Sequence, residues 1–156
     1  MNGLIPRNQL AGFFDKLRAG GTRVVFTNGC FDLLHPGHMK LLARSSEEGD
    51  VLVVAINDDA SVRALKGRSR PIYPAEERAE ILLSVRWVDY VTVFPEATPL
   101  ETIKLIRPDV LIKGAEYKQT EIVGAEFVKN NGGRVVRIPM KPGHSTRRLV
   151  GRMADL

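Results

Sequence analysis

The stretch that decides the fold runs from residue 24 to residue 38 and reads VVFTNGCFDLLHPGH. Its first four residues, Val24 to Thr27, form a short apolar run that predicts a buried strand. A glycine-containing turn follows, and Pro36 pre-sets the backbone dihedral that a helix start requires. The stretch therefore predicts a strand, a turn and a helix in succession.

The rest of the chain repeats this alternation. Further runs rich in Val and Ile predict strands at residues 51–56, 88–94, 110–112 and 135–138. Helical spacing predicts helices over residues 36–48, 75–85, 99–106 (with Thr98 as N-cap) and 121–130. This order predicts an α/β, Rossmann-like fold: a doubly wound parallel five-stranded sheet in a three-layer α/β/α arrangement. We expect a single domain over residues 1–156, with its core at about 22–150.

In such sheets a ligand binds beyond the carboxyl ends of the strands, where the strand order reverses. Motifs that directly follow strands are therefore the candidate site. Asn57 follows the second predicted strand, and Lys113 and Gly114 follow the fourth. Gly114 lets the backbone approach a ligand closely, as do Gly29 and Gly37 near the first strand.

His35 and His38 are three residues apart, so they share one face of the first helical turn. Free backbone N–H groups and the helix dipole already favour an anion at that end of a helix. Two imidazoles added there predict a site for several phosphate oxygens. The alternative is that His35 only caps the helix and His38 lies on the surface.

Other charged and hydroxyl residues fit a phosphate site, each with a plainer alternative. Lys66, Arg68 and Arg70 form a local basic cluster that could bind phosphate. The alternative is a solvated basic loop that contacts no ligand. Arg78 could bind substrate phosphate, but glutamates lie near it in the sequence. The alternative is that it forms a surface ion pair with one of them. Asp32 fits substrate hydroxyls or a turn cap. Ser145 and Thr146 could contact phosphates at a helix N-terminus or simply cap that helix. Asp58 or Asp59 could cap the helix after the second strand. Cys30 is interpreted as structural.

Composition narrows the function classes. The 156 residues carry a formal net charge of +5, with no long basic tail and no aromatic-rich basic stripe, so we expect phosphorylated small molecules as partners, not nucleic acid. No apolar run suggests a membrane span or a signal peptide. The single cysteine forms no internal disulfide, which favours a cytoplasmic location. No His/Cys cluster has metal-ligand spacing, so no metal site is expected.

His35-Pro36-Gly37-His38 resembles the HxGH signature of the cytidylyltransferase-like nucleotidyltransferase superfamily, and the resemblance covers roughly residues 22–150. Within it, the chain is most similar to the bacterial heptose 1-phosphate adenylyltransferases. The segments that carry this closer similarity are 26–32, 55–61, 66–74, 77–78, 88–91, 113–117 and 145–146.

This resemblance implies an enzyme that transfers AMP from ATP to a heptose 1-phosphate, releases pyrophosphate and gives ADP-heptose for the lipopolysaccharide core. It implies ATP as co-substrate, Mg²⁺ accompanying the triphosphate, and a homodimer. The catalytic residues would be His35, His38 and Lys66. The nucleotide would be bound by Thr27, Asn28, Gly29, Phe31, Gly37, Asn57, Lys113, Gly114, Glu116, Ser145 and Thr146. The sugar phosphate would be bound by Asp32, Arg68, Arg70 and Arg78.

The chain departs from the branch pattern at three positions. Glu116 stands where the branch usually has aspartate, and Arg147 stands where it usually has a second threonine. Lys141 stands where the related glycerol-3-phosphate cytidylyltransferases have arginine. The alternatives are therefore a cytidylyltransferase that uses CTP and an alcohol phosphate, or a non-catalytic nucleotide-binding module on the same fold. A nucleic-acid-binding protein is a more distant alternative, suggested by the net charge alone.

Overall fold

The computed structural model describes residues 1–140 and 142–156, and Lys141 lies outside the described residues. Over this range the strands are β1 (Val24–Gly29), β2 (Val51–Asn57), β3 (Tyr90–Phe94), β4 (Val110–Gly114) and β5 (Arg134–Ile138). The α-helices are α1 (Leu10–Ala19), α2 (Pro36–Ser46), α3 (Asp59–Lys66), α4 (Ala75–Leu83), α5 (Leu100–Ile106), α6 (Ala125–Asn130) and α7 (Thr146–Ala154). Two short 3₁₀ helices are η1 (Arg7–Gln9) and η2 (Gln119–Glu121).

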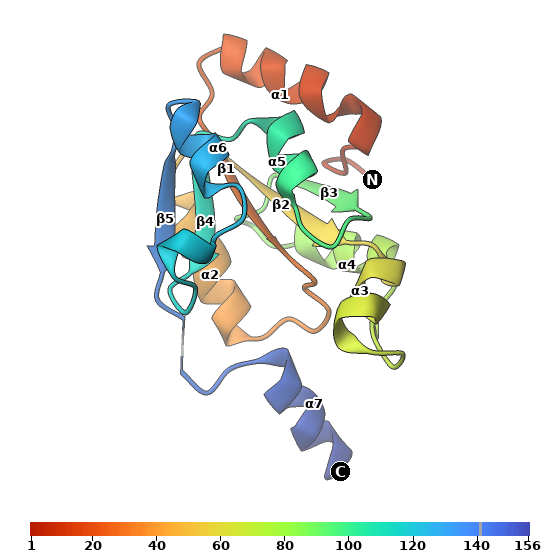
Figure 1. The fold of residues 1–156 in the computed structure, drawn as a ribbon. Helices are drawn as coiled ribbons and strands as arrows, with labels where there is room; N and C mark the ends of the chain where they lie inside the picture. The colour runs from red at the N-terminus through yellow and green to blue at the C-terminus, as the bar shows by residue number, and fades with distance from the viewer. Residues whose placement is uncertain (141) are drawn as a thin grey trace.

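The five strands form one parallel sheet in the order β3-β2-β1-β4-β5, as Figure 1 shows. The order reverses between β1 and β4, so the predicted doubly wound topology is confirmed. Along β1, alternate residues enter different cores because successive side chains point to opposite faces of a sheet. Phe26 packs in the core beneath α1, α5 and α6, whereas Val25 packs in the core beneath α2 and α4. The sheet therefore lies between two helix layers, as predicted.

Most elements differ from the sequence predictions by one or two residues at one end, and two differences have a clear local cause. The helix predicted over 121–130 is split into η2 and α6, because Gly124 adopts a positive φ of 85° and becomes the N-cap of α6. The prediction that Thr98 caps α5 is wrong, since Pro99 is the N-cap residue and no side chain caps that helix. Asp58, in contrast, does cap α3 by accepting a hydrogen bond from the Ser61 amide at 2.8 Å.

The sheet opens at its reversal point. Strands β1 and β2 pair over six residues, from Val24 to Gly29, whereas β1 and β4 pair in the described chain only at Val25↔Val110 and Phe26↔Leu111. Beyond this point Thr27 reaches across to β4 through its hydroxyl, which donates to the carbonyl oxygen of Ile112 at 3.4 Å. The carboxyl ends of β1 and β4 therefore lie apart, which leaves room for a ligand between them.

The helix α7 stands away from the main body (Figure 1), and none of its residues is buried. Among the described residues, no helix is both long enough and apolar enough to cross a bilayer.

Candidate active site

A cleft of about 610 Å³ lies at the carboxyl ends of β1, β2 and β4. Most of the residues predicted for the site line it: Thr27, Asn28, Gly29, Phe31, Asp32, His38, Asn57, Lys66, Arg70, Lys113, Gly114, Glu116 and Thr146. Five predicted residues are not among its lining residues: His35, Gly37, Arg68, Arg78 and Ser145. Residues 27, 28, 29, 57, 113 and 114 are strand ends, so the position that topology gives them brings them together.

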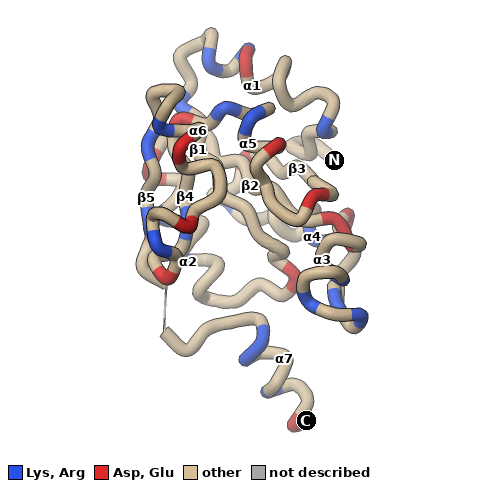
Figure 2. Tube along the Cα trace, viewed as in Figure 1, with Lys and Arg blue, Asp and Glu red and all other residues tan. Residues whose placement is uncertain are grey.

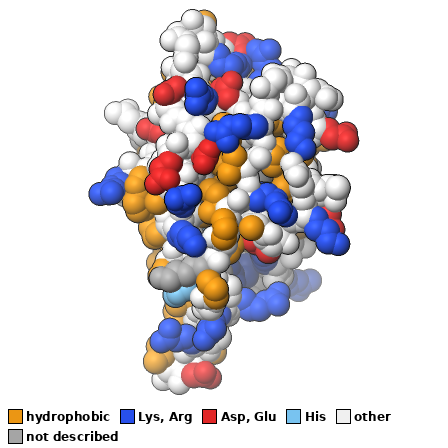
Figure 3. Space-filling model, turned by 90° about the vertical axis from the view of Figure 1, so that its left-hand side faces the viewer, with side chains coloured by type: hydrophobic (Ala, Val, Ile, Leu, Met, Phe, Trp, Pro, Cys, Tyr) orange, Lys and Arg blue, Asp and Glu red, His pale blue; other side chains and the backbone are white. Residues whose placement is uncertain are grey.

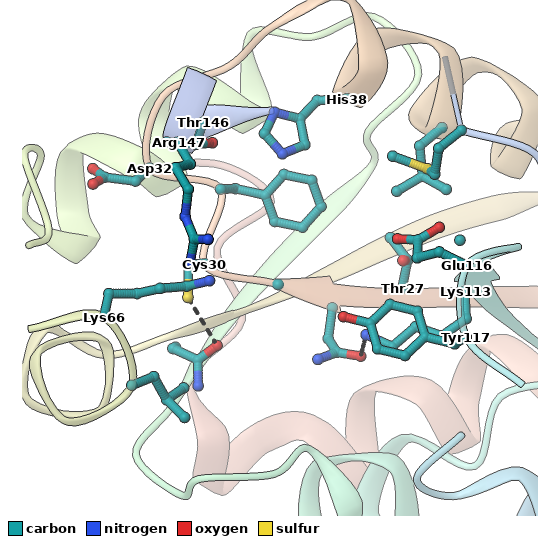
Figure 4. A pocket seen from close by; sticks show the side chains of 18 of the residues that line it. Thr27, Cys30, Asp32, His38, Lys66, Lys113, Glu116, Tyr117, Thr146 and Arg147 are labelled. Atoms are coloured by element: carbon teal, nitrogen blue, oxygen red, sulfur yellow. Dashed lines mark hydrogen bonds between the residues drawn. The ribbon is translucent and has the colours of Figure 1, made fainter. Parts of the chain in front are cut away.

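Figure 4 shows the ring of His38 pointing into the cleft. Cationic side chains, Lys66 and Arg147, lie toward one end of the cleft in this view, and Lys113 and Glu116 lie toward the other (Figure 4). Figure 2 shows Lys and Arg at many places on the molecule, among them the end of α3 and the start of α7, the two elements that supply the first of these ends. The end with Lys66 and Arg147 is therefore suited to phosphates, whereas at the other end Lys113 and Glu116 bring one positive and one negative charge and can hydrogen-bond a ligand.

His35 is the N-cap of α2. Its Nδ1 accepts hydrogen bonds from the backbone N–H groups of Gly37 at 3.1 Å and His38 at 3.4 Å. The expectation that these N–H groups are free for an anion is therefore corrected, because the imidazole already occupies them. Since Nδ1 accepts, the proton of the neutral ring is on Nε2, which leaves that nitrogen as a donor.

The two signature histidines stack, with ring centroids 3.8 Å apart. Burial, reinforced by the neighbouring His144, lowers the pKa of His35. Burial, reinforced by His35, lowers the pKa of His38 to about 3. The Nδ1 atom of His38 is buried and has no hydrogen-bond partner among the described residues. Both rings are therefore neutral at pH 7, so without a ligand they offer hydrogen bonds and no full positive charge.

Gly37 is required by the ring of His35. A Cβ at this position would lie 2.9 Å from both Cε1 and Nδ1 of His35, closer than such contacts allow. The glycine of the signature therefore lets His35 fold back over the helix start.

Asp32 holds a loop in place. Its carboxylate accepts from Arg70 Nε at 2.7 Å and from the amides of Ile72 and Tyr73 at 2.8–3.0 Å. Burial favours the neutral acid, but these amide and guanidinium hydrogen bonds outweigh it and hold the pKa of Asp32 below its ordinary value. Asp32 therefore fixes the basic loop, and since it also lines the cleft, its contact with substrate stays a prediction.

Arg78 is fully buried and does not reach the cleft. Its Nη2 donates to Asp59 at 2.8 Å, Nη1 to the carbonyl of Cys30 at 2.8 Å and Nε to the carbonyl of Tyr73 at 2.9 Å. Because Arg78 is buried and outside the cleft lining, the structure supports neither of the two predicted roles, substrate binding and a surface ion pair. It ties the turn after β1 to the loop before α4, because one guanidinium can satisfy acceptors from three segments. Arg68 is exposed and also lies outside the cleft lining, so its predicted contact with substrate is not supported.

Lys113 lies near the end of β4, and Glu116 follows that strand. Lys113 Nζ donates to Asn28 Oδ1 at 3.2 Å, which links the separated ends of β1 and β4. Burial lowers the pKa of Lys113, although Glu116 and Cys30 partly oppose this. The carboxylate of Glu116 lies against Gly114, where a Cβ would come within 2.2 Å of its Oε2 atom.

Several lining residues were not among the predicted ones: Cys30, Leu41, Leu65, Ala97, Tyr117, Met140, Arg147 and Val150. Tyr117 belongs to the segment that follows β4, and its ring lies 5.1 Å from Nζ of Lys113 near the end of that strand. Arg147 follows Thr146, so both could have been predicted from their neighbours. Cys30 lies 3.7 Å from Asn57 Oδ1, and burial raises the pKa of its thiol although Lys66 and Arg78 oppose this.

Ser145 and Thr146 begin α7. The hydroxyl of Ser145 caps the helix by accepting from the Arg148 amide at 3.0 Å, and Thr146 donates to the carbonyl of Leu33 at 3.3 Å. Thr146 and Val150 thus contribute a wall of the cleft from a helix that is otherwise exposed.

Comparison with known proteins places these features in a family. The family model described as "Cytidylyltransferase-like" matches residues 26–146. Two curated proteins, each described as "Bifunctional protein HldE", are similar over 96% of this chain: one from Gluconacetobacter diazotrophicus (51% identity) and one from Azorhizobium caulinodans (52% identity). The match covers 31% of each relative, so the chain spans about a third of their length.

Solved structures share the fold. A Thermoplasma volcanium protein described as a lipopolysaccharide core biosynthesis protein has a TM-score of 0.66 and 27% identity, covering 78% of this chain and 99% of that one. A pantoate-beta-alanine ligase from Francisella tularensis has a TM-score of 0.68 at 16% identity, covering 90% of this chain and 68% of that one. The second likeness concerns the fold alone.

Proposed function

This chain belongs to the cytidylyltransferase-like family, and we propose that it transfers the AMP group of ATP to a heptose 1-phosphate, releasing pyrophosphate and giving ADP-heptose for the lipopolysaccharide core. One observation carries the proposal: a single cleft has cations and His38 beside one end and Lys113, Gly114 and Glu116 at the other. An ATP molecule has the same polarity, with a charged triphosphate at one end and a hydrogen-bonding base at the other.

The reaction needs positioning and charge neutralisation more than acid–base chemistry. An oxygen of the sugar phosphate attacks the α-phosphorus, the bond from that phosphorus to the bridging oxygen breaks, and pyrophosphate leaves with the electron pair. The nucleophile is already an anion, so no general base is required. We assign His38, Lys66 and Arg147 to the phosphates, because Lys66 and Arg147 lie toward the cationic end of the cleft and the ring of His38 points into it (Figure 4). We assign His35 to holding His38 and the start of α2, with its Nε2 proton as a further donor.

We expect Mg²⁺ to arrive with the triphosphate, held by phosphate oxygens and water, since it neutralises phosphate charge in such transfers. Among the described residues, no group of three or more His, Cys, Asp or Glu is placed to hold a metal ion. The protein side chains would therefore contact the phosphates and leave the cation to them.

The proposal also includes a cytoplasmic location and a homodimer. A reducing compartment suits the single cysteine. Exposed apolar side chains at Ile72, Tyr73 and Ile81, in and beside α4, favour self-association. Light scattering on the purified chain tests the dimer, and a monomer at micromolar concentration would contradict it.

The substrate assignment is tested with ATP and CTP against a panel of aldose 1-phosphates and glycerol 3-phosphate, measuring pyrophosphate release and the nucleotide product. We expect ATP with heptose 1-phosphate to turn over fastest. Pyrophosphate from CTP with glycerol 3-phosphate only would favour the cytidylyltransferase alternative, which rests on Lys141, outside the described residues. No pyrophosphate with any acceptor would favour a non-catalytic nucleotide-binding module.

The role of the histidines is tested separately. Replacing both His35 and His38 with Ala should abolish turnover while the chain stays folded. Arg44→Ala is a matched control on the same helix, since Arg44 makes only an exposed ion pair with Glu47. Undiminished turnover in the double variant would remove the histidines from the mechanism.

A further inference from the structure

The chain has three histidines, and all three lie in one stack. His35 stacks on His38 with centroids 3.8 Å apart and an interplanar angle of 26°. It also stacks toward His144, with centroids 6.4 Å apart and an angle of 23°. His144 comes from the segment before α7, more than 100 residues after the other two, so tertiary folding alone brings it here.

The segment that carries His144 lies against the first turn of α2. The Cβ of His144 is 3.5 Å from where a side chain on Gly37 would begin. Immediately after it, Ser145 caps α7, and Thr146 and Arg147 line the cleft. His144 therefore lies between the histidine signature and the helix that forms a wall of the cleft.

His144 is the exposed member of the stack, whereas His35 and His38 are partly buried. In the space-filling view, a histidine side chain reaches the surface where the C-terminal segment joins the main body, with Lys and Arg side chains below it (Figure 3). Arg148 lies beside the same segment, with its Nη1 atom 3.3 Å from the Cβ position of Gly143. The outer end of the stack thus faces a cationic, open part of the molecule.

We propose that His144 is a third phosphate-binding imidazole, which contacts the β- and γ-phosphates at the outer end of the stack while His38 contacts the inner phosphate. This inference rests on the proposed function, because it assigns a residue to the group that leaves as pyrophosphate. The two inner rings are neutral without ligand, so they bring no full charge to a leaving group that carries several negative charges. An exposed imidazole next to Arg147 and Arg148 adds a donor where that charge collects.

The histidine content of the chain makes a direct test possible. An imidazole ¹H–¹⁵N NMR spectrum will contain signals from three rings only, and His144→Gln identifies the outer one. The probe is inorganic pyrophosphate with Mg²⁺. We expect the signals of all three histidines to move on titration.

Affinity gives the second readout. His144→Ala should weaken pyrophosphate binding about tenfold, the loss expected for one charge-assisted hydrogen bond, with a smaller loss in His144→Gln, which keeps a donor. Arg152→Gln is the matched control, because Arg152 is an exposed cation in the last turn of α7 and does not belong to the segment that lies against α2. In turnover, the KM for ATP should rise more than kcat falls.

The outcomes separate the inference from the proposed function. The inference is wrong if the His35 and His38 signals move and the His144 signal does not. It is also wrong if His144→Ala and wild type bind pyrophosphate equally well. Either result would leave the proposed function standing. If no histidine signal moves and no acceptor yields pyrophosphate, both fail.

Discussion

Two buried arrangements of charge set the shape of the cleft at the scale of single residues. Asp32 accepts hydrogen bonds from Arg70 and two backbone amides. Arg78 donates hydrogen bonds to Asp59 and two backbone carbonyls. Both fix the loop between α3 and α4, which follows Lys66. The cleft-lining Arg70 of this loop is therefore positioned by Asp32, and the end of the loop is positioned by the buried Arg78.

Arg78→Lys should lower the free energy of unfolding by about 3 kcal/mol, because the three donors of a lysine lie on one nitrogen and cannot reach acceptors that Arg78 contacts from three separate nitrogens, which leaves buried polar groups unpaired. Urea denaturation followed by circular dichroism measures this. Arg68→Lys, on the exposed part of the loop, is the control and should change stability by less than about 0.5 kcal/mol. An equal effect of the two substitutions would refute the role given to Arg78.

Stability should fall with acidification because of His38. Its folded-state pKa of about 3 lies below the value near 6.5 of an unfolded chain, so between these values the unfolded state binds more protons. The free energy of unfolding should then decrease by about 2 kcal/mol from pH 7 to pH 5. His35 contributes in the same direction, whereas Asp32 titrates below this window.

His38→Gln should flatten this dependence, measured by urea denaturation at each pH. Arg44→Ala should keep it. A wild-type stability that is constant between pH 7 and pH 5 would contradict the burial of a neutral His38.

Among the elements, α7 combines an active-site wall with little contribution to the core. Thr146, Arg147 and Val150 line the cleft, yet no residue of the helix is buried. A chain that stops after Gly143 should therefore unfold with a free energy within about 1 kcal/mol of the full chain. Its affinity for ATP should drop at least about tenfold, since the loss includes a cationic contact with phosphate.

Calorimetric titration with ATP and urea denaturation test the two halves of this prediction. A truncated chain that binds ATP normally would show that α7 is not part of the nucleotide site. A chain that fails to fold would show that α7 stabilises the core.

Elements were predictable where a local pattern decides them. The apolar runs of the strands are such patterns, and the residues that end β1, β2 and β4 follow from the topology. The break at Gly124 was not predictable, because an apolar pattern does not report a positive φ. Arg78 lies in a helix rich in glutamate, and its burial depends on which distant loop packs over it.

Across the whole molecule, the two hydrophobic cores share the same strands. Val25 and Phe26 are neighbours in sequence but belong to different cores, and Val53 and Val54 behave likewise. Neither core can therefore be lost while the sheet survives. We predict that the chain unfolds in one cooperative transition, which also tests the single-domain expectation.

The single tryptophan makes this measurable. Trp87 packs against the core of α2 and α4, so its fluorescence reports that side of the sheet, while far-ultraviolet circular dichroism reports all helices. The two urea transitions should coincide. Separate midpoints would indicate that the layers unfold independently.

The short pairing of β1 with β4 has a consequence for how the molecule is held together when it works. Two residue pairs join the half-sheet β3-β2-β1 to the half-sheet β4-β5, and the link from Lys113 to Asn28 lies on the floor of the cleft. A nucleotide that touches both strand ends becomes a bridge between the halves. Part of the free energy that holds the two half-sheets together would then come from the bound ligand, and its release would leave β1 and β4 joined by their two residue pairs.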